Sequence, residues 1–394
     1  MKILVLAWEF PPRIVGGIAR HVAELYPEIV KLGHEIHLIT VEFGSTPKYE
    51  LVEGIHLYRC HVLHGNDFFH WIANMNESMG SLGGDLIAKH GDFEMIHAHD
   101  WLVGDAAIAL KNIFKLPLVA TIHATEYGRY NGIHNLNQQY INGKEKLLAH
   151  EAWRIIVCSQ YMRQEIQRVF QSPEDKIDVI YNGIRPEKKQ HDSFDRLKFR
   201  RRFANDKEKI VYYVGRMTYE KGISVLLNAA PLIIEAINGS VKFVIIGGGN
   251  TNYLKHLAYI LGIWEKCYFT GFMSDADLDK FQTIADCAVF PSLYEPFGIV
   301  ALESFAAKVP VVVSDTGGLA EVVQHDYTGI VTRANDPYSL TEGVLTVLNN
   351  PDRCQYLVEN AYKSLAERFN WDDLAKQTVA VYGQVAYERS QVYW

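Results

Sequence analysis

Short runs of β-branched and aliphatic residues alternate along the chain with longer stretches in which apolar residues recur at helical spacing. This alternation predicts parallel sheets that helices cover on both faces. The first run, residues 3–7, leads through two prolines and two glycines into a predicted helix that ends at Gly33. The predicted apolar face of that helix consists of Ile18, Val22, Leu25, Ile29 and Leu32.

The same alternation divides the chain into two halves. Further strands are predicted in the first half at residues 36–40, 95–98, 118–122, 155–158 and 178–181. The periodicity then disappears over residues 185–209, where basic residues outnumber acidic ones, and we expect the connection between two domains there, with helical character towards its end. Strands are predicted again at residues 210–214, 241–246, 267–270, 287–290 and 309–314, and residues 371–394 have the pattern of a helix. The fold class is therefore α/β, with two doubly wound domains that are expected to face each other across a cleft.

Composition narrows the class of protein. The 394 residues are 48% hydrophobic and 22% charged, which excludes a disordered or fibrous chain. The net charge of −7 lacks the positive balance that is typical of proteins that bind nucleic acid, so nucleic acid is not an expected partner. The five cysteines are widely separated and form no C-x-x-C pair, which argues against a disulfide framework or a zinc cage. No apolar run suits a signal peptide or a membrane span, so we expect a cytoplasmic protein, with peripheral contact at the inner membrane face left open.

Ligands of open parallel sheets bind at the carboxyl ends of the strands, so the loops after strands carry the candidate chemistry. Gly16 and Gly17 lie between the first strand and its helix, where they suit either a close approach to an anion or a tight turn. Arg216 and Lys221 follow the first strand of the second domain and together can neutralise a diphosphate without a metal. An exposed surface pair would explain these two cations as well. Gly248, in a run of three glycines, marks another close-approach loop.

The densest motif follows the strand predicted at residues 287–290. Pro296 fixes the course of a loop, Gly298 frees the backbone, and a helix that begins nearby would direct its N–H groups at an anion. Glu295 and Glu303 bracket that helix start, and Glu303 can accept hydrogen bonds from two vicinal hydroxyls such as those of a ribose. One glutamate near a helix start is ordinary dipole compensation, whereas the pair favours a binding role.

Histidines and acidic residues are the candidate metal ligands of this chain. His97 and His99 share a face near a strand end, but no fourth ligand has suitable spacing, so no metal is predicted. His123, at the end of the next strand, can hydrogen-bond a sugar hydroxyl or act as a structural histidine. The D-x-D pattern at residues 275–277 follows Ser274, so we interpret it as a helix N-cap with acids in the first turn.

Together these motifs resemble the retaining glycosyltransferase family 4, whose members have two Rossmann-like domains around a nucleotide-sugar cleft, the GT-B architecture. The resemblance rests on the N-terminal glycine pair, on H-A-H-D-W, on G-R-x-x-x-x-K-G and on the E-x7-E spacing. It implies an acceptor-side domain at residues 1–184, completed by residues 371–394 as a helix that crosses back. It also implies a nucleotide-sugar-binding domain at residues 185–370.

The resemblance also implies roles for single residues. It implies that Arg216 and Lys221 bind the donor diphosphate and that Glu303 binds the nucleoside ribose. Glu295, with the backbone around Phe297 and Gly298, is implied to hold the transferred sugar and the phosphates. The implied catalytic residues are His123, Arg216, Lys221 and Glu295. The implied substrate-binding residues are Gly16, Gly17, Arg216, Lys221, Gly248, Phe272, Glu295, Phe297, Gly298, Ile299 and Glu303.

The reaction implied by the resemblance is transfer of a hexosyl group with retention, without a metal or other cofactor. The expected donor is a nucleoside diphosphate sugar, UDP-glucose, and the expected acceptor is a saccharide or a lipid-linked saccharide. H-A-H-D-W is similar to starch and glycogen synthases, but those enzymes carry a lysine where this chain has Val15, which argues against an α-glucan polymerase. A nucleotide-sugar epimerase, a glycosyl phosphorylase and a non-catalytic sugar-nucleotide-binding scaffold remain alternatives.

Overall fold

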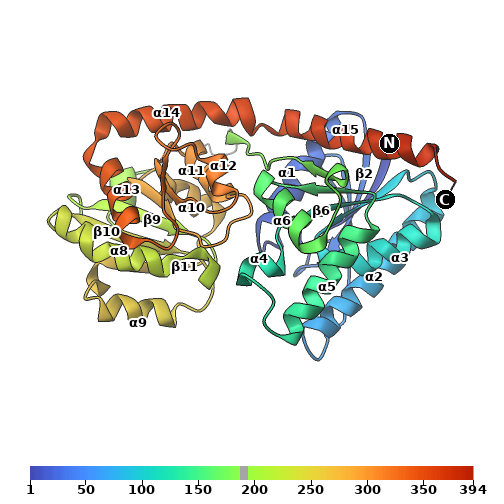
Figure 1. The fold of residues 1–394 in the computed structure, drawn as a ribbon, viewed down its shortest axis with the longest axis horizontal. Coiled ribbons are helices and arrows are strands. Elements are labelled where there is room, and N and C mark those ends of the chain that lie inside the picture. Colours follow the sequence, from blue (N-terminus) through green and yellow to red (C-terminus); the bar gives the residue numbers. More distant parts are fainter. Residues whose placement is uncertain (187–193, 394) are drawn as a thin grey trace. The chain divides into compact units, whose positions relative to one another are not determined.

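The computed structural model describes residues 1–186 and 194–393, which form two compact units (Figure 1). The first unit contains Met1–Gly183 and Trp371–Trp394, and the second contains Ile184–Asn370. Part of the connection expected at residues 185–209 lies outside the described residues, as does the last residue of the chain. Helix α7 (Arg196–Arg200) supplies the helical character expected towards the end of that connection.

The first unit is built on a sheet with the strand order β3-β4-β2-β1-β5-β6-β7-β8. Neighbouring strands are parallel except for β3, which runs antiparallel to β4. The strands are β1 (Lys2–Leu6), β2 (Glu35–Val41), β3 (Tyr49–Val52), β4 (Ile55–Cys60), β5 (Met95–His99), β6 (Leu118–Ile122), β7 (Arg154–Val157) and β8 (Ile177–Val179). All six strands predicted for this half are confirmed, and the hairpin β3–β4 was missed. Its edge strand β3 has no fully buried residue, so it lacks the apolar run that marks the central strands.

Helices cover this sheet, and the C-terminal segment returns to it (Figure 1). The helices are α1 (Gly17–Lys31), α2 (Phe68–His90), α3 (Gly104–Phe114), α4 (Glu126–Tyr130), α5 (Leu136–Glu151), α6 (Gln160–Phe170) and α15 (Trp371–Ser390), with short 3-10 turns η1 (Trp101–Val103) and η2 (Glu174–Lys176). Helix α15 packs on α1, where Trp371 Nε1 donates a hydrogen bond to Glu24 Oε2 at 2.6 Å. The closing helix is therefore confirmed as part of the first unit.

The apolar face predicted for α1 is confirmed in all but its last position. Four of its five residues are buried, but Leu32 is 41% exposed. Helix α1 ends at Lys31, so Leu32 no longer follows the helical period, and placing it in the core was wrong. Gly33 has φ +86°, a conformation that glycine adopts without strain after a helix end.

The second unit is a parallel sheet with the order β11-β10-β9-β12-β13-β14. Its strands are β9 (Lys209–Val214), β10 (Val241–Ile246), β11 (Cys267–Gly271), β12 (Cys287–Phe290), β13 (Val311–Ser314) and β14 (Ile330–Thr332). The five predicted strands are confirmed, and β14 was missed because a three-residue strand is too short to show a period. The helices are α8 (Ile223–Ala236), α9 (Asn252–Ile260), α10 (Asp275–Gln282), α11 (Ile299–Ala306), α12 (Leu319–Val322), α13 (Pro337–Asn349) and α14 (Pro351–Arg368), with 3-10 turns η4 (Tyr219–Lys221) and η5 (Trp264–Lys266).

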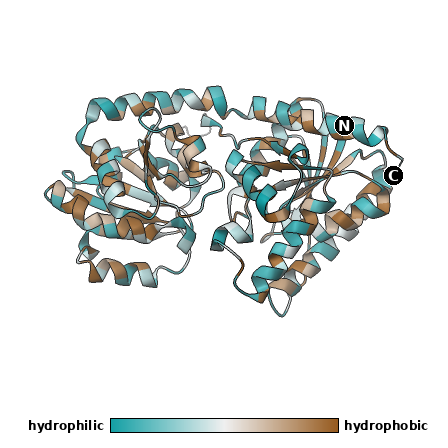
Figure 2. Cartoon of the chain, in the orientation of Figure 1, coloured by the Kyte–Doolittle hydropathy of each residue, from teal (hydrophilic) through white to brown (hydrophobic). Residues whose placement is uncertain are grey.

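Burial follows the predicted pattern in both units. The central strands are hydrophobic along most of their length, whereas the outer helices mix hydrophobic and hydrophilic residues (Figure 2). Such near-continuous apolar strands are typical of sheets covered on both faces. The acidic stretch before Leu278 is a capped helix start as predicted, because the Ser274 side chain accepts a hydrogen bond from the backbone N–H of Asp277. Among the described residues, no helix has both the length and the apolar content that a bilayer crossing requires.

Candidate functional site

In the second unit, the loop after β9 meets the loop after β12. Lys221 Nζ lies 2.7 Å from Glu295 Oε2. Glu295 is only 9% exposed, so the pair is largely shielded from solvent. The backbone carbonyl of Glu220 accepts hydrogen bonds from the N–H groups of Leu293 and Tyr294, at 2.8 and 3.1 Å. These bonds hold the two loops together and fix the lysine beside the carboxylate.

Arg216 lies in the same loop but remains exposed. Its guanidinium is 3.4 Å from Glu220 Oε1, a long contact between residues four apart. An exposed pair of this kind contributes little to stability. Arg216 is therefore able to turn towards an anionic ligand at small cost.

Two glycines allow the loops of this unit to approach each other closely. Gly222 has φ +63°, and a Cβ atom there would lie 1.9 Å from the carbonyl oxygen of Pro291. Gly298, immediately before α11, has φ +107°, and its Cβ would lie 2.5 Å from Leu319 Cδ2. A side chain at either position would force the loops apart, so both glycines are needed for the observed packing.

The remaining candidates of this unit lie around the same carboxyl ends of the strands. Glu303, in α11, is 4% exposed, and Phe297 is also buried. Ile299, the first residue of α11, is half-buried. The structure leaves two candidates exposed on neighbouring loops, namely Gly248 after β10 and Phe272 after β11.

In the first unit, histidines gather at the ends of β5 and β6. His97 and His99 lie on one face of β5 as predicted, with ring centroids 4.5 Å apart. The Tyr26 hydroxyl is within hydrogen-bond distance of both rings, 3.0 Å from His97 Nδ1 and 2.6 Å from His99 Nε2. Tyr382 of α15 lies 2.6 Å from the same nitrogen of His97. His123 follows β6, and its Nε2 lies 3.0 Å from His99 Nδ1.

His21 was not predicted from the sequence motifs. It lies in α1 and is the fourth histidine of this group. Its Nδ1 lies 2.7 Å from Asn182 Oδ1, and its ring centroid is 4.8 Å from that of His123. His21 Nε2 is buried without a hydrogen-bond partner. One signal was present in the sequence, because His21 falls one helical turn after Ile18 on the apolar face of α1.

Imidazole nitrogens of His21, His99 and His123 lie within 4.8 Å of one another, a spacing compatible with a cation. No metal was predicted here, because the motif at residues 97–101 offers no fourth ligand. The hydrogen bond between His99 and His123 already engages one nitrogen of each ring. Metal independence therefore stays a prediction.

Burial sets the charge of this group. Desolvation lowers the pKa of His21 and of His123 to about 3, and it lowers the pKa of His97 and His99 well below the ordinary value. All four rings are therefore neutral at pH 7 and can act as hydrogen-bond partners but not as cations. Asp100 accepts the backbone N–H of His123 at 2.7 Å, and burial raises the pKa of this carboxyl to about 6.

The glycine pair lies in an exposed loop at the start of α1. Glu9, which the motif reading also missed, is buried beneath this loop. Its Oε2 accepts the backbone N–H groups of Val15 and Gly16 at 2.5 and 2.9 Å. The amide of Gly16 is therefore engaged by the protein itself, which limits its direct role in binding a ligand.

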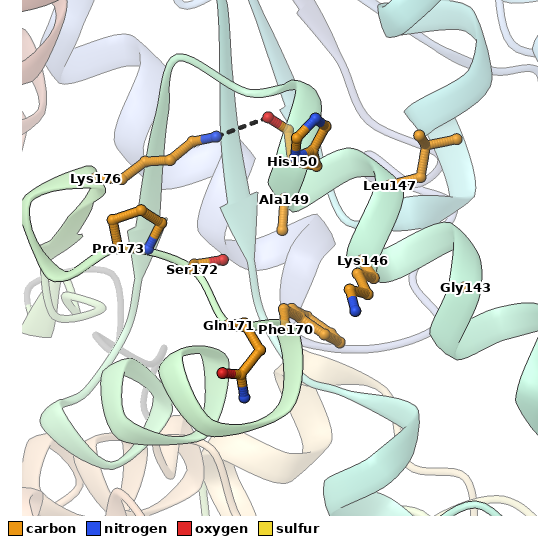
Figure 3. Close-up of a pocket in the computed structure, with 10 residues that line it drawn as sticks. All are labelled: Gly143, Lys146, Leu147, Ala149, His150, Phe170, Gln171, Ser172, Pro173 and Lys176. Atoms are coloured by element: carbon orange, nitrogen blue, oxygen red, sulfur yellow. Dashed lines mark hydrogen bonds between the residues drawn. The ribbon is translucent and has the colours of Figure 1, made fainter.

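A pocket of about 340 Å³ lies elsewhere in the first unit (Figure 3). It is lined by α5, by the last residue of α6 and by the segment that follows α6, and Lys176 Nζ donates to the carbonyl of His150 at 2.7 Å across it. Helices α5 and α6 end just before β7 and β8 begin, so the pocket lies towards the amino ends of these strands. It contains none of the predicted site residues.

Comparison with known families accounts for most of the chain. Residues 15–188 match the family described as Glycosyltransferase Family 4, and residues 194–364 match Glycosyl transferases group 1. An uncharacterized glycosyltransferase of Methanocaldococcus jannaschii is 41% identical over 390 residues, 97% of this chain and 98% of the relative. A glycogen synthase of Mycobacterium tuberculosis is 32% identical over 398 residues, 97% of this chain and 94% of the relative.

Solved structures share the fold over almost the whole chain. Sucrose-phosphate synthase from Thermosynechococcus elongatus has a TM-score of 0.82 at 23% identity, with 98% of both chains covered. HepE from Anabaena, solved with UDP and glucose, has a TM-score of 0.76 at 20% identity, with 98% of this chain and 100% of that chain covered. These similarities agree with two Rossmann-like α/β sheets in one chain.

Proposed function

This chain belongs to glycosyltransferase family 4 and uses a nucleotide sugar, and on that premise we propose that it moves a glucosyl group from UDP-glucose to a saccharide or lipid-linked saccharide, with retention at the anomeric carbon. The observation that carries the proposal is the buried Lys221–Glu295 pair with Arg216 beside it. One cation held in place and one exposed cation at the carboxyl end of β9 suit a diphosphate leaving group.

The reaction breaks the bond between the anomeric carbon and an oxygen of the β-phosphate, so negative charge develops on that phosphate. Lys221, Arg216 and the N–H groups at the start of α11 are proposed to stabilise this charge by electrostatic preorganisation. The acceptor oxygen forms the new bond on the same face of the sugar, and its proton passes to the departing phosphate oxygen. No carboxylate acts as a nucleophile in this scheme, and the neutral His123 is proposed to hydrogen-bond a hydroxyl of the transferred sugar.

The donor base and sugar are proposed from several lines of support. Glu303 is buried at the second turn of α11, where a carboxylate can accept hydrogen bonds from ribose hydroxyls. HepE, which shares the fold, was solved with UDP-glucose, whereas starch synthase IV of Arabidopsis thaliana was solved with ADP and acarbose. UDP-glucose is therefore the first candidate donor and ADP-glucose the second.

UDP and UDP-glucose are expected to raise the melting temperature of the purified protein more than ADP, GDP or their glucose conjugates. A ligand at 100 times its Kd stabilises the folded state by about 2.7 kcal/mol, which a thermal-shift panel resolves. Replacing Glu303 with Gln is expected to reduce the shift, whereas Glu235→Gln, on an exposed position of α8, is the matched control. Stabilisation by ADP-glucose alone would replace the proposed donor, and no shift with any nucleotide would contradict the proposed function.

A growing α-glucan is the second candidate acceptor, because a relative that is 32% identical is called a glycogen synthase. Val15 argues against this candidate, since the resemblance places a lysine of starch and glycogen synthases at that position. The two candidates differ in their products. Repeated transfer to maltooligosaccharides would lengthen the chains by many units, whereas a decorating transferase adds one.

Excess EDTA is expected to leave the transfer rate unchanged. Lys221 and Arg216 supply the positive charge that a divalent cation supplies in metal-dependent transferases. The rate of UDP release with and without chelator checks this prediction. Loss of activity that Mn²⁺ or Mg²⁺ restores would contradict it, and it would direct attention to the cluster of His21, His99 and His123.

A further inference from the structure

One cation of the first unit packs against two indole rings at the carboxyl end of β1. The Arg13 guanidinium is 5.4 Å from the ring centroid of Trp8 and 5.4 Å from that of Trp71. Trp8 follows β1, Arg13 belongs to the loop that leads to the glycine pair, and Trp71 lies in the first turn of α2. We call this group the Trp8–Arg13–Trp71 stack. The two indole rings lie edge to face, with centroids 6.5 Å apart and an angle of 74° between their planes, so both rings contact the guanidinium but do not sandwich it.

The stack lacks the partners that a buried cation normally has. Arg13 is half-buried, yet among residues 1–186 and 194–393 its side chain has neither a hydrogen bond nor an ion pair. Its Nε and the indole Nε1 of Trp8 are both buried without a hydrogen-bond partner. Buried donors are costly to leave unpaired, and such groups are common where a ligand completes the site.

Among the described residues, the Glu9 carboxylate makes neither a hydrogen bond nor an ion pair with the Arg13 side chain. Glu9 acts on Arg13 only through its charge, and its carboxylate accepts the backbone N–H groups of Val15 and Gly16. Burial lowers the pKa of Arg13, but an arginine remains protonated in proteins. The chain thus keeps a positive charge without a direct carboxylate contact beside an exposed loop, where Ile14 and Val15 are 42% and 45% exposed.

We propose that the Trp8–Arg13–Trp71 stack binds an oxyanion carried by the acceptor saccharide, a phosphate or a carboxylate group. A guanidinium matches two oxygens of either group in a forked geometry, and indole faces pack well against the apolar faces of sugar rings. This inference rests on the proposed function and narrows its acceptor to anionic sugars.

The donor is the competing source of an anion, and its charge already has proposed partners. Arg216 and Lys221 belong to the second unit and are proposed to hold the donor diphosphate. Arg13 belongs to the first unit, which the domain assignment gives to the acceptor. We therefore assign the Arg13 guanidinium to the acceptor, which is the substrate that receives the sugar.

Steady-state kinetics with UDP-glucose test the inference. Glucose 1-phosphate, glucose 6-phosphate and glucuronate are compared with glucose and maltose as acceptors, and UDP release is measured against donor hydrolysis. At least one anionic sugar is expected to be used with a kcat/KM about 10-fold or more above its neutral counterpart. Arg13→Gln is expected to raise the KM for that sugar by about 10- to 100-fold while the donor KM and the hydrolysis rate stay the same. Arg13→Lys should restore part of the loss.

Arg168→Gln is the control for loss of an arginine beside an aromatic ring, because Arg168 is exposed and lies 5.5 Å from the ring of Tyr127. Binding without donor gives a second readout. The anionic sugars are expected to change the tryptophan fluorescence of the wild-type protein, and the change should be lost in Arg13→Gln and reduced in Trp71→Phe. Arg168→Gln should leave both readouts unchanged.

Three results would overturn the inference. Neutral and anionic acceptors used equally well, with no effect of Arg13→Gln, would leave the stack a structural feature. A raised donor KM or slower hydrolysis in Arg13→Gln would assign the arginine to the donor. Absence of any fluorescence change with the anionic sugars would also reject the site. A protein that binds and hydrolyses no nucleotide sugar would instead contradict the proposed function, and the fluorescence test would still decide on the anion site.

Discussion

Replacing Lys221 with alanine is expected to lower the rate of glycosyl transfer by about 100-fold or more. The ammonium group is held 2.7 Å from Glu295 in a largely buried pair, so it is already oriented before any substrate arrives. A positioned charge of this kind acts on the phosphate where negative charge grows in the transition state, and it needs no reorganisation at that moment. Arg216→Ala is expected to reduce kcat/KM by a similar factor. More of that loss should appear as a raised donor KM, because the Arg216 side chain is exposed before the donor binds.

The measurement is UDP release and product formation at saturating donor, with kcat and KM determined separately. Lys363→Ala, at an exposed position of α14 in the same unit, is the control for removal of a lysine charge. Melting curves must accompany the rates, because Lys221→Ala leaves Glu295 without its cation at a buried position. Near-normal turnover in a folded Lys221→Ala protein would remove this lysine from the mechanism.

Much of the fold could be predicted from the sequence because central parallel strands are buried on both faces and read as short apolar runs. Each predicted run, such as residues 118–122 and 241–246, became a strand of the expected sheet. The strands that were missed lie at or next to the edges of the two sheets, namely β3, its neighbour β4, and β14. Strand β3 exposes alternate residues to solvent, and β14 has only three residues, so neither carries the pattern of a core strand.

The candidate site was predictable only where its residues are close in sequence. The stretch from Ser292 to Glu303 and the pair in the β9 loop stand out as local motifs. The contacts that shape the histidine group join distant segments instead. His97 meets Tyr382 from a position 285 residues away, and His21 meets Asn182 across 161 residues. No local pattern encodes such pairs, because the sheet order and the return of α15 bring them together.

The stack around Arg13 illustrates the same limit. An arginine after two prolines reads as an ordinary loop residue, and Trp71 is one of seven tryptophans in the chain. Only the packing of the start of α2 against the end of β1 makes the arginine a cation without a carboxylate partner. Tertiary structure thus turns an unremarkable loop charge into a candidate binding group.

Acidification from pH 7 to pH 5 is expected to remove about 2 kcal/mol of stability through His21 alone. Burial lowers the pKa of His21 in the folded protein to about 3, whereas an unfolded histidine titrates near 6.5. Below pH 6.5 the unfolded chain therefore binds a proton that the folded chain does not, and the contribution of neutral His21 declines as pH falls towards the folded pKa. His123, with the same low pKa, acts in the same direction.

Carboxyl groups of the same unit change the free energy of unfolding in the opposite direction as pH falls. The pH dependence of the wild-type protein alone therefore cannot test His21, and a variant is needed. Burial raises the pKa of Asp100 to about 6 and also raises that of Glu9, and such groups gain stability as pH falls through the raised value. We therefore compare the free energy of unfolding of His21→Gln with wild type at pH 7 and pH 5. The difference is expected to move by about 2 kcal/mol in favour of the variant at the lower pH.

His64→Gln, at an exposed position of the same unit, should follow the wild-type curve at both values. If the difference in the free energy of unfolding between His21→Gln and wild type is the same at both pH values, His21 has the same pKa in the folded and unfolded protein. A charged His21 beside His123 would repel any cation and would change the hydrogen-bond role proposed for His123 towards the sugar. The same two-pH comparison thus tests both the burial of the histidine group and the premise that it meets its ligand uncharged.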